Sequence, residues 1–163
     1  ESAFNPKIQA IGETGLDKAV DIDIELQEIV FIRQIKISEK HAKPLIIHCV
    51  RAWSELLSLR KKIRPAAPWI VHGFNKNLSL ANQLVQHGFC LSFGKALCSG
   101  IPALSEAFIN TPLDGIFLET DDSDIKINDI YQTAAKLKKV SIKEMKSQIE
   151  KNYRQTFNSR YGD

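Results

Sequence analysis

Five short apolar runs, each followed by a segment with helical spacing, constrain the fold of this chain more than any other feature. The runs lie in IQAIGETGLD (residues 8–17), PLIIHCV (44–50), PWIVHGF (68–74), FCLSFG (89–94) and GIFLETD (115–121). Such alternation predicts βαβ units and a parallel sheet. Two architectures fit this pattern: an open doubly wound sheet, and part of a (β/α)-barrel.

Apolar residues at helical spacing lie between the runs and predict the connecting helices. A long amphipathic helix is expected within residues 21–43, and others are expected after the second and third runs, around residues 103–109, and twice in the basic tail. The residues that carry the first of these predictions are Leu26, Ile29, Val30 and Ile37.

Composition places the chain among ordinary globular domains. Its 163 residues are 44% hydrophobic and 25% charged, which favours a single domain over residues 1–163. A net charge of +3 is too small for nonspecific nucleic-acid binding by itself, so any phosphate recognition must be local. The three cysteines are odd in number and not closely spaced, which favours a reducing, cytoplasmic setting. No apolar stretch is long enough to predict a membrane span.

Side chains able to bind a metal follow four of the five apolar runs. No glycine-rich nucleotide-binding pattern follows any run, so the sequence favours a site built from strand ends. In parallel α/β proteins these ends share one edge of the sheet, and side chains there are expected to converge. The four residues, each expected to finish its strand, are Glu13, His48, His72 and Asp121.

Each of these four residues also has an ordinary structural explanation when taken singly. His48 and His72 are then hydrogen-bonded structural histidines, and Asp121 caps the next helix. His41 and His87 lie in polar, helix-like segments and are interpreted as ordinary structural histidines. Together, however, two imidazoles and two carboxylates form a nitrogen and oxygen set suited to Zn, Mn, Mg or Fe.

Several segments carry a family pattern, in order from about Ala10 to Phe157: AIGETGLD, Gln27, Phe31 and Gln34 as Q-x-x-x-F-x-x-Q, KPLIIHC, VHGF, GFCLSFG and LDGIFLETD. With these segments the chain resembles the TatD-like metal-dependent deoxyribonucleases of the amidohydrolase superfamily. The resemblance implies a TIM-like (β/α)-barrel in which Glu13 joins or bridges two divalent metals, with His48, His72 and Asp121 as further ligands.

Two departures from the family pattern affect this expectation. The H-x-H pair that the family carries on its first strand is absent, since no histidine precedes Gly12, and the loop after Asp121 lacks the usual proline and Arg-Asn. The chain is therefore expected to be the C-terminal part of the barrel, about five strands, the fourth to the eighth. An N-terminal segment of the same protein or a second copy is expected to complete it. An open five-stranded α/β sheet is the alternative.

The function that the resemblance implies is hydrolysis of DNA phosphodiester bonds, in single strands or at strand ends. Glu13 and Asp121 are the expected catalytic groups, with Asp121 accepting a proton from the attacking water. Arg51 and Lys95 are candidate phosphate contacts. Two alternatives stay open: a small-molecule C–N hydrolase or deaminase of the same superfamily, and a non-catalytic remnant, because the H-x-H ligands are absent.

Overall fold

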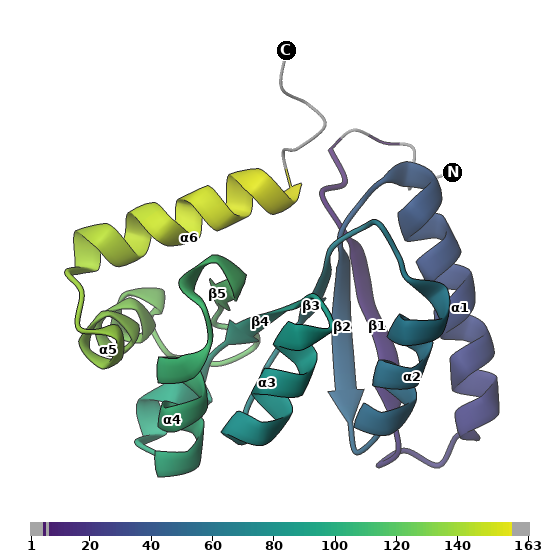
Figure 1. The fold of residues 1–163 in the computed structure, drawn as a ribbon, viewed down its shortest axis with the longest axis horizontal. Helices are drawn as coiled ribbons and strands as arrows, with labels where there is room; N and C mark the ends of the chain where they lie inside the picture. Colours follow the sequence, from purple (N-terminus) through teal and green to yellow (C-terminus); the bar gives the residue numbers. More distant parts are fainter. Residues whose placement is uncertain (1–4, 6, 158–163) are drawn as a thin grey trace. The chain divides into compact units, whose positions relative to one another are not determined.

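The computed structural model describes residues 5 and 7–157, which adopt an α/β fold with one parallel five-stranded sheet (Figure 1). All five apolar runs form strands, as predicted. The order of the strands in the sheet follows their order in the chain. The strands are β1 (Ile11–Asp17), β2 (Leu45–Val50), β3 (Trp69–Val71), β4 (Phe89–Phe93) and β5 (Ile116–Leu118).

Helices connect successive strands, and the chain divides into two compact units, one ending at Val71 and one beginning at His72. A single domain over residues 1–163 stays a prediction. No helix in the described part of the chain is long and apolar enough to cross a membrane. The α-helices are α1 (Ile24–His41), α2 (Trp53–Ile63), α3 (Leu78–Gln86), α4 (Pro102–Asn110), α5 (Ile127–Lys138) and α6 (Ile142–Phe157). The 3-10 helices within the described residues are η2 (Lys95–Ser99) and η3 (Leu113–Gly115).

The first unit is a βαβαβ arrangement whose core lies between its strands and helices α1 and α2, which pack against them (Figure 1). The ring of Phe31 on α1 lies 5.6 Å from that of Trp69 on β3, and the Arg60 guanidinium of α2 stacks 5.1 Å from the Trp69 ring. Leu45 and Ile47 of β2 are fully buried. This apolar burial joins the two helices to the strands and is the main stabilising term of the unit.

Helix α1 buries a different face from the one its most regular apolar spacing suggests. Asp23 caps its first turn by accepting hydrogen bonds from the backbone of Glu25 and Leu26, and Phe31 and Ile35 are buried. The residues that predicted the helix are 40–54% exposed: Leu26, Ile29, Val30 and Ile37. Helical spacing thus predicted the helix, but the strands pack against the neighbouring face, which contains Phe31 and Ile35.

The second unit is centred on aromatic packing. Phe93 of β4 contacts Phe74 and Phe108 edge-on, with ring centroids 5.5 Å and 4.9 Å apart. The buried amide of Asn152 on α6 donates hydrogen bonds of 2.7 Å and 2.8 Å to the carbonyls of Leu113 and Ile116. These bonds satisfy main-chain groups at the start of β5 and anchor α6 there.

The ends of two strands differ from the sequence expectation. Glu13 and His48 do not finish their strands, because β1 continues to Asp17 and β2 to Val50. The reason is the parallel pairing of the two strands, which extends through Gly15–His48 and on to Asp17–Val50. His72 does follow β3 directly, and Asp121 is the third residue after β5.

Candidate metal centre

Glu13 lies in an irregular part of β1. Ile11 pairs with Leu45 and Thr14 with Ile47, so β1 advances by three residues where β2 advances by two. The extra residue makes a bulge, a feature that bends a strand and redirects a side chain. Gly12 permits the close approach, because a Cβ atom there would lie 2.7 Å from the Cβ of Ile46.

His48 is positioned by the close contact of its main chain with Gly15. The two residues are register partners, and a Cβ atom on Gly15 would lie 1.9 Å from the His48 carbonyl oxygen. Gly15 also has a φ of +149°, which L side chains rarely adopt. Only glycine therefore brings β1 this close to the backbone that carries the His48 imidazole.

Three of the four predicted ligands come together. Ligand atoms of Glu13, His48 and His72 all lie within 4.8 Å of one another. Glu13 is exposed, whereas both histidines are half-buried. His72 is joined by one peptide bond to Val71, which pairs with Ile47 of β2, so the end of β3 places it.

This donor set fits a divalent cation. One carboxylate and two imidazoles are ligands typical of catalytic rather than structural zinc, and they also suit Mn or Fe. With bonds of about 2.1 Å, ligand atoms around one ion are separated by at most about 4.2 Å, close to the spacing observed. Small side-chain adjustments would thus bring Glu13, His48 and His72 onto one ion.

The other three predicted site residues lie outside this group. Asp121 is exposed, with a φ of 49° in the loop that follows β5. Arg51, also exposed, follows the last residue of β2, and exposed Lys95 begins η2. Their assignments as ligand and phosphate contacts stay predictions.

Glu119, which the sequence reasoning missed, is the acid that contacts His72. Its Oε1 lies 3.7 Å from Nδ1 of His72 and accepts a 2.6 Å hydrogen bond from the Gly73 amide, while Oε2 accepts one from the Ser92 hydroxyl. Burial, the largest single influence, raises the pKa of Glu119, but the hydrogen bonds from His72, Ser92 and Gly73 together lower it below its ordinary value.

The position of Glu119 in the sequence contained the information needed to find it. It is the residue directly after β5, so the strand-end rule that selected His72 also selects Glu119. Asp121 was preferred in the same ETD segment, although it lies two residues further from the strand.

An α/β sheet with nitrogen and oxygen donors near its strands is typical of metal-dependent hydrolases, and comparison with known proteins specifies the family. The family model TatD related DNase matches residues 1–158. The chain therefore belongs to the TatD family.

Similar proteins carry hydrolase and nuclease names. The uncharacterized metal-dependent hydrolase YjjV of Escherichia coli (strain K12) is 30% identical over 126 residues, covering 75% of this chain and 48% of YjjV. The putative deoxyribonuclease tatdn3 of Danio rerio is 31% identical over 125 residues, covering 72% and 46% of the two chains. The 3'-5' RNA nuclease TATDN2 of Homo sapiens is 32% identical over 123 residues, covering 72% and 16%.

The fold is also that of a solved relative. The crystal structure of YjjV superposes with a TM-score of 0.86 at 24% identity, covering 93% of this chain and 64% of that one. This likeness concerns the fold alone. The chain spans about half the length of YjjV and tatdn3 in the sequence comparisons.

Proposed function

We propose that this chain forms part of a TatD-like deoxyribonuclease that hydrolyses phosphodiester bonds of DNA, in single strands or at strand ends. The observation that carries the proposal is the grouping of Glu13, His48 and His72 within 4.8 Å in a member of the TatD family. The names of tatdn3 and TATDN2 support a nucleic-acid substrate.

Under this proposal the residues of the chain have three roles: binding metal, accepting a proton and contacting phosphate. Glu13, His48 and His72 hold metal, with Asp121 as a further ligand that also accepts a proton from the attacking water. Divalent ions such as Mg, Mn or Zn, two in the complete site, would when bound supply positive charge to polarise a phosphoryl oxygen and acidify that water. Arg51 and Lys95 contact phosphate, for which their charge and exposure are suited.

The fold proposal is that the sheet is the fourth to eighth strands of a (β/α)-barrel, completed by an N-terminal segment of the same protein or by a second copy. Two observations support it. In the described sheet β1 has a neighbour on one side only, which leaves backbone groups available for another strand. Helix α1 presents an exposed apolar stripe, which includes Leu26, Ile29 and Val30, and such patches mark contact surfaces.

A nuclease assay tests the activity. The chain is incubated with end-labelled single-stranded DNA, and in parallel with RNA of the same sequence, in Mg or Mn. Glu13→Gln and His72→Asn are expected to lower DNA cleavage by about 100-fold, since each removes a proposed ligand. Asp21→Asn, an exposed acid before α1, is the matched control and should cleave normally. Cleavage that persists in both ligand variants contradicts the metal assignment, and a preference for RNA corrects the substrate.

Light scattering after size-exclusion chromatography tests the fold proposal. A dimer that dissociates in Ile29→Lys supports completion by a second copy through the α1 stripe. Full activity and reversible, cooperative unfolding as an 18.4 kDa monomer would contradict the need for completion.

A further inference from the structure

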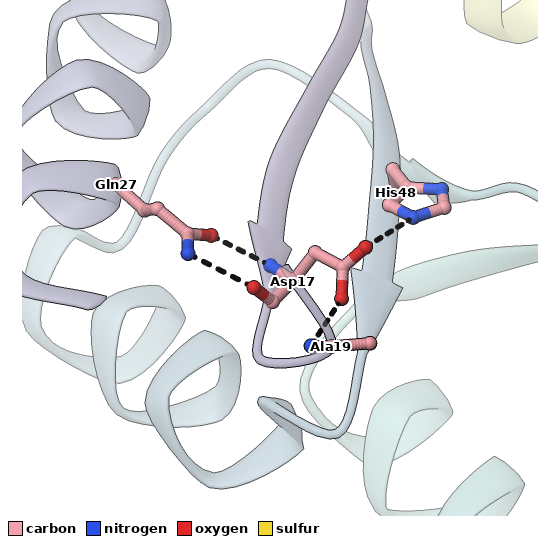
Figure 2. A network of polar contacts seen from close by, with 4 residues as sticks. All are labelled: Asp17, Ala19, Gln27 and His48. Carbon is pink, nitrogen blue, oxygen red and sulfur yellow. Dashed lines mark hydrogen bonds and ion pairs between the residues drawn. The ribbon is translucent and has the colours of Figure 1, made fainter. Parts of the chain in front are cut away.

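The carboxylate of Asp17, at the end of β1, lies between the main chain and the His48 ring (Figure 2). Its Oδ1 accepts a 2.6 Å hydrogen bond from the Ala19 amide, and its Oδ2 lies 3.5 Å from Nε2 of His48. A small rotation of the ring would bring the second contact to hydrogen-bond length. Asp17 itself is not one of the three grouped ligands.

The main chain of Asp17 is held by one side chain, that of Gln27. Its Oε1 accepts a 2.7 Å bond from the Asp17 amide, and its Nε2 donates 2.9 Å bonds to the carbonyls of Asp17 and Ile22. Figure 2 shows the paired bonds to Asp17. Only this orientation of the Gln27 amide satisfies all three bonds. These bonds link the end of β1 to the first turns of α1. They fix the position of the backbone that carries the Asp17 carboxylate.

The neighbouring lysine does not compete for this carboxylate. The Lys18 ammonium contacts Glu55 of α2 at 2.5 Å, so its charge is directed to another acid. Asp17 is thus an acid whose backbone is clamped, whose Oδ1 is occupied, and whose Oδ2 is directed to an imidazole nitrogen.

We infer that Asp17 is a positioning residue for His48. Its Oδ2 accepts a hydrogen bond from the Nε2–H group of the His48 ring, which sets the ring tautomer and leaves Nδ1 as the ligand atom. Gln27 holds Asp17 in place. The chemical reason is that a neutral imidazole carries one proton, and the group that binds it decides which nitrogen is left to coordinate. The role toward metal rests on the proposed function, whereas the tautomer assignment concerns the metal-free chain.

The first test is the tautomer of His48 in the metal-free chain. The sequence has only four histidines, so ring ¹⁵N resonances at pH 8 are assignable with His→Asn variants. Wild type is expected to carry the proton on Nε2. In Asp17→Asn the Ala19 amide keeps its acceptor, so the NH₂ group faces His48 and favours protonation of Nδ1 instead. An unchanged tautomer in Asp17→Asn overturns the inference, whatever the metal affinity.

The second test is zinc affinity by calorimetry on the whole chain. Asp17→Asn is expected to weaken binding 10- to 100-fold, as is typical for loss of an outer partner of a metal ligand. Gln27→Glu, which keeps the acceptor for the Asp17 amide but loses both donors, should weaken it less. Asp21→Asn is the control and should bind as wild type.

The outcomes separate the two proposals. Asp17→Glu, which restores a carboxylate, should recover part of the affinity and the wild-type tautomer. Zinc affinity within twofold of wild type in Asp17→Asn overturns the positioning role toward metal. A wild-type chain that binds no zinc yet shows the tautomer change would refute the metal site while leaving the Asp17–His48 assignment intact.

Discussion

Each compact unit pairs a histidine with an acid, but the two pairs are held by different means. In the first unit Asp17 lies 3.5 Å from His48, whose side chain is 44% exposed; Gln27 holds the Asp17 backbone with two hydrogen bonds, and the Ala19 amide donates one to its carboxylate. In the second unit Glu119 lies 3.7 Å from His72, whose side chain is 11% exposed, and hydrogen bonds from Ser92 and Gly73 act on its carboxylate directly.

The two pairs are therefore expected to have different effects: the first on the orientation of the His48 ring, and the second on the stability of its unit. Water screens the exposed Asp17–His48 pair, so its effect on folding is small and its importance lies in the direction of the ring. Glu119 is about as exposed as Asp17, at 20% against 23%, but Ser92 and Gly73 donate directly to its carboxylate, so the unit loses stability when these donors lose their acceptor. Variants that affect one pair and not the other therefore test this comparison.

Gly15→Ala should have the largest effect, because it moves the main chain on which the first pair depends. The added methyl would lie 1.9 Å from the His48 carbonyl at a φ of +149°, and we expect a loss of about 3 kcal/mol in the free energy of unfolding. Urea unfolding measures it. Gly100→Ala is the control, since it has a φ of +68° but nothing within 4 Å; an equal loss in both variants would show that the contact with His48 is unimportant.

Replacing each acid by its amide compares the pairs directly. Glu119→Gln places an NH₂ group near the Ser92 and Gly73 donors, and a loss of about 2 kcal/mol is expected. Asp17→Asn should cost less than about 1 kcal/mol, as for exposed ion pairs. Chemical denaturation of both variants gives the two values. Equal losses would remove the distinction between the pairs.

Shortening Gln27 should have a smaller effect than Glu119→Gln. Gln27→Ala removes three hydrogen bonds to a partly exposed loop that water can replace, so a loss of about 1 kcal/mol is expected. Thermal unfolding followed by circular dichroism measures the change. Asn152→Ala, which leaves two carbonyls without their buried donor, is the counterpart in the second unit and should cost more.

The last comparison concerns pH and the second unit alone, and its effect is reduced because Lys138 is only half-buried and water screens its charge. Burial lowers the pKa of Lys138 from 10.5 to about 8. The unfolded chain then binds more protons than the folded one between about pH 8 and 10.5, so this lysine makes the unfolding free energy rise with pH across that window. Comparing wild type with Lys138→Met at pH 7.5 and 9.5 isolates the contribution. A difference between the two proteins that stays constant with pH would contradict it.

The secondary structure could largely be predicted from the sequence, because apolar runs and helical spacing act locally. Each run became a strand, and the predicted helix within residues 21–43 is α1. Which face of α1 is buried could not be predicted, since Phe31 and Ile35 gain their burial from strands distant in sequence.

Part of the candidate site could be predicted as well. The strand-end rule selected Glu13, His48 and His72, whose ligand atoms lie within 4.8 Å of one another. The same rule also selects Glu119 in the ETD segment, which was missed, while the assignment of Asp121 stays a prediction. Asp17 and Gln27 were seen only as members of motifs, because their hydrogen bonds join residues ten positions apart.

By itself, the sequence determined the order of strands and helices, the chemistry of the donor atoms and membership of the TatD family. These follow from residue types and their spacing along the chain. Only the tertiary structure decided that Glu13 lies in a bulge, that Gly15 meets the His48 backbone, and that His48 faces Asp17 and His72 faces Glu119. The physical reason is that strand register and side-chain contacts depend on which segments pack together, and small shifts in register redirect every side chain.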